Sequence, residues 1–134
     1  MAQLNPYLTF NGNAREAMEF YNACLGGELS IMTVGDSPMA SQMPDKKDNV
    51  IHSLLKKDGM VLMASDMIMP GDLRQGNNVT LCINGGTVEE LQRFFAKLSK
   101  GGTVGQPLTE AFFGTYGDLT DKFGVHWMFQ ADNA

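Results

Sequence analysis

The 134-residue chain contains little cysteine, tryptophan or histidine: two Cys, one Trp and two His. Its cysteines, Cys24 and Cys82, are too few for a disulfide framework and lack CxxC spacing. Both lie in apolar patterns, which predicts buried, reduced thiols in a cytoplasmic protein. The N-terminus has no basic region followed by an apolar one, so we expect no signal peptide. No apolar run reaches the roughly 18 residues of a membrane span, and we expect no membrane partner.

Basic residues are also few. Lys and Arg total ten against fifteen Asp and Glu, which gives a formal net charge of −5. The basic residues are scattered, and their longest runs are the pairs Lys46-Lys47 and Lys56-Lys57. A nucleic-acid interface usually shows a basic stripe or patch. The sequence therefore predicts no nucleic-acid partner.

Glycine and methionine, by contrast, are abundant, with fifteen and ten residues. The glycines mark an internal repeat. The segment 8–12 (LTFNG) is echoed by 81–85 (LCING), and Gly26-Gly27 is echoed by Gly101-Gly102. Glycine tolerates the left-handed conformation that ends many helices, so each pair predicts a helix end. Landmarks repeated at a nearly constant offset predict a duplicated module.

Hydrophobic periodicity and turn residues predict the same order of elements in both halves. The first half is predicted to hold a helix over 14–25 and strands over 6–10, 29–34, 50–57 and 60–66. The second half is predicted to hold a helix over 88–98 and strands over 78–83, 103–108, 112–119 and 125–130. Asn13 and Thr87 precede the helices, each with a Glu three residues later, which predicts N-terminal caps.

These elements predict one α+β domain over 1–134. It comprises a βαβββ module one over 1–66, a connector rich in Met, Pro and Gly over 67–77, and a βαβββ module two over 78–134. Five stretches accompany this pattern: 7–12 (YLTFNG), 17–21 (AMEFY), 51–55 (IHSLL), 63–66 (MASD) and 120–127 (TDKFGVHW). The combination resembles the vicinal oxygen chelate superfamily, which includes glyoxalase I, extradiol dioxygenases and the bleomycin and fosfomycin resistance proteins. Within it, the chain is similar to the PhnB-like branch, whose domains are also labelled 3-demethylubiquinone-9 3-methyltransferase.

The resemblance implies a glyoxalase-like, half-open barrel whose sheets curl around a pocket, in a homodimer. Whether the modules pair within one chain or across the dimer stays open. The methyltransferase label finds little support in the sequence, because no glycine-rich loop follows a strand as in a Rossmann methyl-donor site.

Members of the superfamily hold a divalent metal through His, Gln and Glu on the first and last strands of the modules. The corresponding positions here are Tyr7, then Asn78 or Thr80, then the segment 61–64, and finally Met128 in place of a Glu. None supplies a matching ligand, and a thioether suits a hard or borderline cation poorly. We therefore expect no metal and no cofactor.

Polar residues near the expected pocket are the remaining candidates. His52 matches a histidine of the PhnB-like branch, and Tyr116 lies where the branch has a tyrosine–glycine pair. His126 lies on the last strand, and Asp66 ends the fourth strand. Each has a structural alternative: a satisfied sheet histidine, a packed tyrosine or a strand-end acceptor. The full set of pocket candidates is Tyr7, His52, Asp66, Asn78, Thr80, Tyr116, His126 and Met128.

The leading interpretation is a metal-independent protein that binds a small molecule in a pocket lined partly by flexible methionines. The alternative is a metal-dependent lyase, dioxygenase or thiol transferase of the same superfamily, which would need an unforeseen site. A metal-free acid–base enzyme using His52, and an interaction protein acting through its dimer surface, are further possibilities. The sequence leaves open whether any reaction is catalysed.

Overall fold

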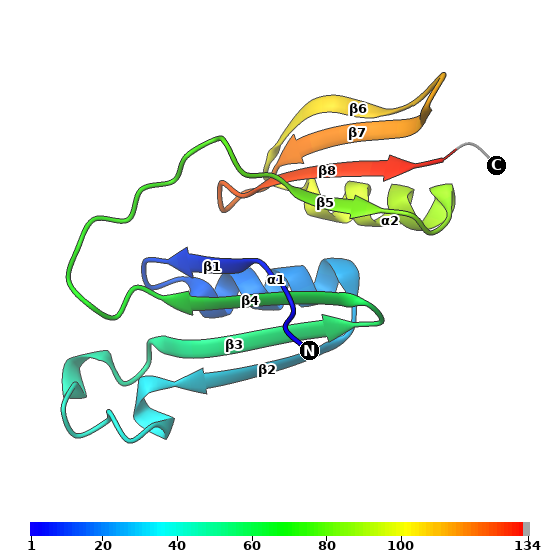
Figure 1. Ribbon diagram of the computed structural model, residues 1–134. Helices are drawn as coiled ribbons and strands as arrows, with labels where there is room; N and C mark the ends of the chain where they lie inside the picture. Colours follow the sequence, from blue (N-terminus) through cyan, green and yellow to red (C-terminus); the bar gives the residue numbers. More distant parts are fainter. Residues whose placement is uncertain (133–134) are drawn as a thin grey trace. The chain divides into compact units, whose positions relative to one another are not determined.

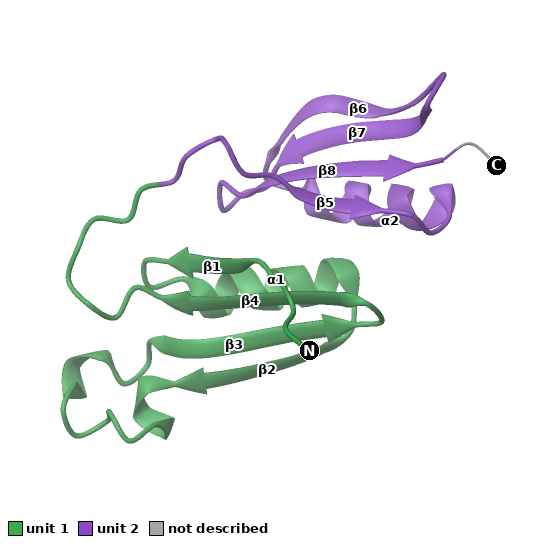
Figure 2. Cartoon of the chain, viewed as in Figure 1, with its two compact units in different colours: residues 1–74 green, residues 75–134 purple. Residues whose placement is uncertain are grey.

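The computed structural model describes residues 1–132, which form two α-helices and two four-stranded sheets. The chain divides into two compact units, unit 1 over residues 1–74 and unit 2 over residues 75–134 (Figure 2). Each unit contains one strand, one helix and three further strands in that order (Figure 1). The predicted α+β class and the βαβββ repeat are therefore confirmed. Neither α-helix of this described part is long and apolar enough to cross a membrane.

Unit 1 is a mixed sheet with one helix on one face. Its elements are β1 (Tyr7–Phe10), α1 (Ala14–Leu25), β2 (Glu28–Thr33), β3 (Val50–Lys57) and β4 (Met60–Asp66), with short 3-10 helices η1 (Val34–Asp36) and η2 (Pro44–Lys46). The strand order is β1-β4-β3-β2, with β1 parallel to β4 and the other pairs antiparallel. The helix buries its apolar stripe, which includes Met18 and Tyr21. This is the amphipathic face that the periodicity predicted.

Unit 2 repeats the arrangement. Its elements are β5 (Leu81–Asn84), α2 (Val88–Leu98), β6 (Thr103–Ala111), β7 (Gly114–Thr120) and β8 (His126–Ala131). The strand order is β5-β8-β7-β6, and β5 is parallel to β8. Helix α2 buries Leu91, Phe94 and Leu98, and the Phe95 ring meets the Phe129 ring edge-on at 5.1 Å between centroids. In each unit we call the sheet face turned away from the helix the open face.

The two helices begin in different ways. Thr87 Oγ1 accepts a hydrogen bond from the backbone N–H of Glu90 at 3.1 Å, so the predicted cap of α2 is confirmed. The prediction for α1 is wrong, because the Asn13 side chain makes no capping hydrogen bond. Asp66 Oδ1 instead accepts from the N–H groups of Gly12 and Ala14, both at 2.9 Å. A carboxylate from the end of β4 thus supplies the acceptor that the first turn needs.

Several predicted bounds also move. Strand β2 begins one residue earlier than expected, and β5 begins at Leu81, so Asn78 and Thr80 precede the strand. The pair Phe112-Phe113 is not in a strand, because Ala111 pairs with Gly114 and leaves these rings in the hairpin turn. The helix-ending glycines behave as predicted: Gly26 caps α1 with φ of 79°, and Gly101 follows α2 with φ of 77°.

Candidate functional site

The open face of unit 2 gathers polar side chains on its two central strands. Side chains alternate across a sheet, and Leu119, Trp127 and Phe129 are buried on the α2 side. Tyr116, Asp118, Thr120, His126 and Met128 therefore share the open face. Strand pairing sets Asp118 opposite Met128 and Thr120 opposite His126. Because polar residues alternate with buried apolar ones along β7 and β8, these two strands present a largely polar surface on the open face.

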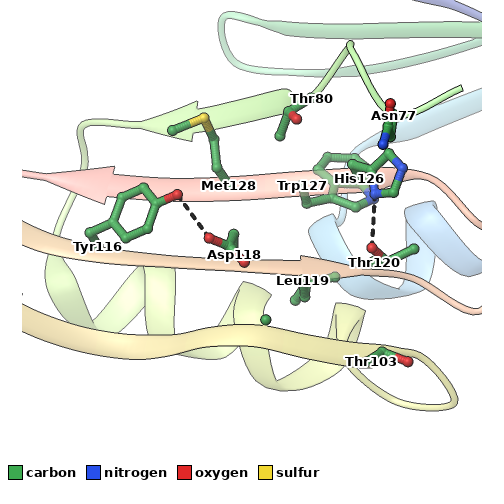
Figure 3. Close-up of a pocket in the computed structure, with 11 residues that line it drawn as sticks. Asn77, Thr80, Thr103, Tyr116, Asp118, Leu119, Thr120, His126, Trp127 and Met128 are labelled. Carbon is green, nitrogen blue, oxygen red and sulfur yellow. Dashed lines mark hydrogen bonds between the residues drawn. The ribbon is translucent and has the colours of Figure 1, made fainter.

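This face borders a cavity of about 280 Å³, close to the lower end of the size range of small-molecule sites. Figure 3 shows the lining residues, which come from the loop before β5 and from strands β6, β7 and β8. The lining residues are Asn77, Thr80, Thr103, Gly105, Tyr116, Asp118, Leu119, Thr120, His126, Trp127 and Met128.

Two hydrogen-bonded pairs organise the cavity wall (Figure 3). The Tyr116 hydroxyl donates to Asp118 Oδ2 at 2.8 Å, and the backbone N–H of Gln106 donates to Asp118 Oδ1 at 3.0 Å. Thr120 Oγ1 and His126 Nδ1 lie 2.8 Å apart. Each of these four side chains is therefore held by a neighbour on its own strand or the next one. Groups held in this way lose less freedom when a ligand binds, which lowers the entropic cost of binding.

The electrostatics of the wall are dominated by Asp118. The hydrogen bond to Asp118 raises the pKa of Tyr116 above its ordinary value of 10.0. Burial, the negative charge of Asp118 and the electrostatic interaction with Cys82 raise this pKa further. Ionising the tyrosine would break its donation to a carboxylate and place a second negative charge beside the first. The structure therefore keeps Tyr116 as a neutral hydrogen-bond donor.

Cys82 corrects one expectation. The structure exposes its thiol, whereas Cys24 is buried as predicted. Cys82 pairs with Met128 in the sheet, so its side chain lies on the open face rather than under α2. The apolar pattern around it comes from its neighbours Leu81 and Ile83, which are less exposed.

The predicted candidates of unit 1 lie together only in part. The Tyr7 hydroxyl lies 3.3 Å from His52 Nδ1, and the two rings stack with 5.9 Å between centroids. Both are on the open face of unit 1, and Tyr7 is 46% exposed. Asp66 is buried on the opposite face at 3% exposure. Besides the start of α1, it accepts from the N–H of Val50 at 2.8 Å, which is the strand-end acceptor role named as its alternative.

The structure therefore distributes the candidates over several places. Thr80, Tyr116, His126 and Met128 line the cavity of unit 2, whereas Asn78 lies in the preceding loop and is not among the lining residues. The sequence reasoning missed Asp118 and Thr120. The signal that could have found them is the period of two in β7, which places both on the same face as Tyr116.

The cavity wall contains few side chains that could act as metal ligands. Among the cavity-lining residues, His126 and Asp118 are the two of a type that commonly ligates divalent metals, and each is bonded to a neighbouring hydroxyl. Protein sites for such ions usually supply three or more ligands. Across residues 1–132 no three His, Cys, Asp or Glu side chains cluster in a way that could hold a metal ion.

The fold and this face define the class of protein: a small α+β protein of the glyoxalase-like fold, built from two βαβββ modules. A family model described as 3-demethylubiquinone-9 3-methyltransferase matches residues 2–130. The chain therefore belongs to that family, which is the PhnB-like group of the vicinal oxygen chelate superfamily. It is also 33% identical to Protein YjdN of Escherichia coli strain K12, over 93% of this chain and 92% of that protein.

Solved structures agree with this assignment. Protein PA1353 from Pseudomonas aeruginosa is 36% identical and matches with a TM-score of 0.84 over 100% of both chains. The PhnB protein from Bacillus cereus is 28% identical, with a TM-score of 0.76 over 97% of this chain and 99% of that one. A glyoxylase/bleomycin resistance protein/dioxygenase domain from Frankia is 15% identical with a TM-score of 0.69 over 99% and 98%, which shows the shared fold alone.

Proposed function

We propose that the protein binds a small molecule without a metal ion, and that the open face of unit 2 contributes the binding surface. The observation that supports this most directly is the preformed cavity with Tyr116–Asp118 and Thr120–His126 pairs in its wall. On the open face, the Met128 side chain adds an apolar surface to this wall. A few fixed polar groups in a partly apolar concavity are typical of small-molecule sites.

Metal independence is supported by what occupies the positions where the superfamily holds its metal. Met128 offers a thioether where a carboxylate would be expected, and Thr80 offers a hydroxyl. His126 already shares its Nδ1 with Thr120. The exposed Tyr7 and His52 of unit 1 bond to each other and lack a carboxylate on their own open-face neighbours Met63 and Ser65. These groups suit hydrogen bonding to an organic ligand better than coordination.

Elemental analysis of protein purified without chelators tests this proposal. We expect divalent metals far below stoichiometry and ligand binding that is unchanged after chelator treatment. About one Zn, Ni or Mn per chain, with binding lost on chelation, would overturn it.

The methyltransferase named by the family description is not our proposal. A Rossmann methyl-donor site joins a strand to a helix through a glycine-rich G-x-G-x-x-G loop in a parallel sheet. Here the strand–helix connections read Asn11-Gly12-Asn13 and Gly85-Gly86-Thr87, and three of the four strands in each described sheet pair antiparallel.

The fold also supports a second candidate, a metal-dependent lyase, dioxygenase or thiol transferase of the superfamily. This candidate requires turnover of glutathione adducts or catechols once Zn, Ni, Mn or Fe is added. Rates that stay flat under every metal would remove it.

We also propose that the protein is a homodimer. Unit 2 exposes an aromatic hairpin tip, with Phe112 at 96% and Phe113 at 45% exposure and their rings edge-on at 5.2 Å. Exposed apolar clusters of this kind often mark association surfaces. Sedimentation equilibrium should give the mass of a dimer, and Phe112→Ser should weaken it. A monomer at every concentration would contradict the proposal.

A further inference from the structure

The residues that line the unit 2 cavity include a negative charge and no Lys or Arg to balance it. Of the eleven residues that line it, Asp118 alone carries a full charge when histidine is counted as neutral. None of the eleven is Lys or Arg. An anionic ligand group would therefore find no cation in the wall and would face a carboxylate. A like charge at close range disfavours binding, whereas an opposite charge favours it.

The hydrogen-bonding groups show the same bias. The two oxygens of Asp118 each accept one hydrogen bond from the protein, from Tyr116 and from Gln106, and each oxygen has a second acceptor position left. The Tyr116 hydroxyl donates its single hydrogen to Asp118, so toward a ligand its oxygen can act only as an acceptor. The raised pKa of Tyr116 keeps that hydrogen in place. The wall around Asp118 thus offers acceptors.

An alkylammonium group matches this wall. It carries three donors, no acceptor and a positive charge, so it can satisfy the free positions on Asp118 and Tyr116 together. The apolar body of such a ligand would contact the side chain of Met128, which is adaptable and polarizable. An acid of the same shape lacks donors and repels Asp118.

We propose that the unit 2 cavity selects small ligands that carry a cationic amine beside an apolar group, with Asp118 as the residue that determines charge specificity. This inference rests on the proposed function, because it names the ligand class of the same site. Selection of cationic ligands would also distinguish such a binding protein from a thiol transferase, because glutathione substrates are anionic.

Three probes of similar shape test the inference: phenethylamine, 2-phenylacetamide and 3-phenylpropionate, which are cationic, neutral and anionic. Each is titrated into the full chain at slightly alkaline pH, where histidine side chains are ordinarily neutral. Amide chemical shifts in proton–nitrogen spectra report binding and locate it. We expect phenethylamine to shift the amides of Asp118, Thr120 and His126, and 3-phenylpropionate to leave them unmoved.

Two variants remove one negative charge each. Asp118→Asn keeps the size of the side chain and an acceptor oxygen, and we expect it to weaken phenethylamine binding roughly tenfold. Glu89→Gln removes a charge from the exposed first turn of α2, on the other side of the sheet. We expect this control to bind phenethylamine like the unmodified chain, which excludes a nonspecific effect of the net charge of −5.

The outcomes distinguish the inference from the proposed function. Equal or tighter binding of the amide or the acid, equal effects of the two variants, or no shift with phenethylamine would each overturn charge selection. Binding of the acid to metal-free protein would leave the proposed function standing. A stoichiometric metal found by elemental analysis would remove the proposed function whatever the probes show.

Discussion

The two units share a backbone plan but differ in what they place on their open faces. Leu54 pairs with Met63 in unit 1, and at the matching position of unit 2 Thr120 pairs with His126. The same frame thus carries an apolar pair in one unit and a hydrogen-bonded pair in the other. Backbone duplication fixes where side chains point, and the side chains alone decide which face suits a polar ligand.

A second difference lies in how each unit uses a buried carboxylate. Asp66 in unit 1 joins the starts of α1 and β3 to the end of β4. Asp121 in unit 2 is equally buried at 3% exposure, but it accepts from Phe123 and Val125 in its own turn and from Trp127 Nε1. The buried carboxylate of unit 1 therefore connects segments that are distant in sequence, whereas that of unit 2 stabilises a local turn and the strand that follows it.

The largest effect is expected from Asp66→Ala. The change leaves the N–H groups of Gly12, Ala14 and Val50 without their acceptor, two of them buried. We expect a loss of roughly 3–5 kcal/mol in the free energy of unfolding. Urea unfolding followed by circular dichroism measures it, with Asp66→Asn giving a smaller loss because one acceptor oxygen stays. A loss no larger than that of an exposed carboxylate would contradict this role.

A smaller effect is expected at the helix starts. Thr87→Ala removes the side-chain cap of α2 and should cost about 1 kcal/mol. Asn13→Ala is the matched control in α1, where no side-chain cap exists, and should cost at most a few tenths of a kcal/mol. Equal losses from the two changes in urea unfolding would show that the helices do not begin differently.

The smallest effect concerns alkaline pH. Because the folded-state pKa of Tyr116 is raised, its neutral form contributes stability below pH 10.0, and this contribution is lost as pH rises through the raised pKa. Phenolate absorbance should show one tyrosine ionising above its ordinary value, and Tyr116→Phe should remove that step. Asp118→Asn should lower the step toward 10.0, because the charged acceptor is gone. If the ionisation step of Tyr116 stayed unchanged in Asp118→Asn, Asp118 would not be the cause of the raised pKa.

The sequence predicted the fold well where its signals are local. Helix α1, helix α2 and strands β3 and β4 have the bounds that periodicity and turn residues indicated. Thr87 was predicted because its cap reaches only three residues along the chain. Asp66 was not predicted as the cap of α1, because its partner Ala14 lies 52 residues away and nothing local to α1 indicates it.

The candidate site was predicted less completely. Tyr116 was found through a family likeness, and His126 as one of two histidines, on the last strand. Asp118 was passed over although it alternates with Tyr116 on the same strand. The importance of Asp118 arises from three segments meeting, namely its own strand, the Gln106 backbone and the cavity. Sequence periodicity gives the face on which a residue lies, whereas tertiary packing decides whether that face borders a cavity.

Native mass spectrometry of freshly purified protein shows directly whether the chain binds an organic amine without a metal ion. We predict a chain that carries no divalent metal and that retains or takes up an organic amine, with uptake reduced in Asp118→Asn. A mass increase of about one divalent metal ion per chain, lost together with ligand binding after chelation, would contradict the account.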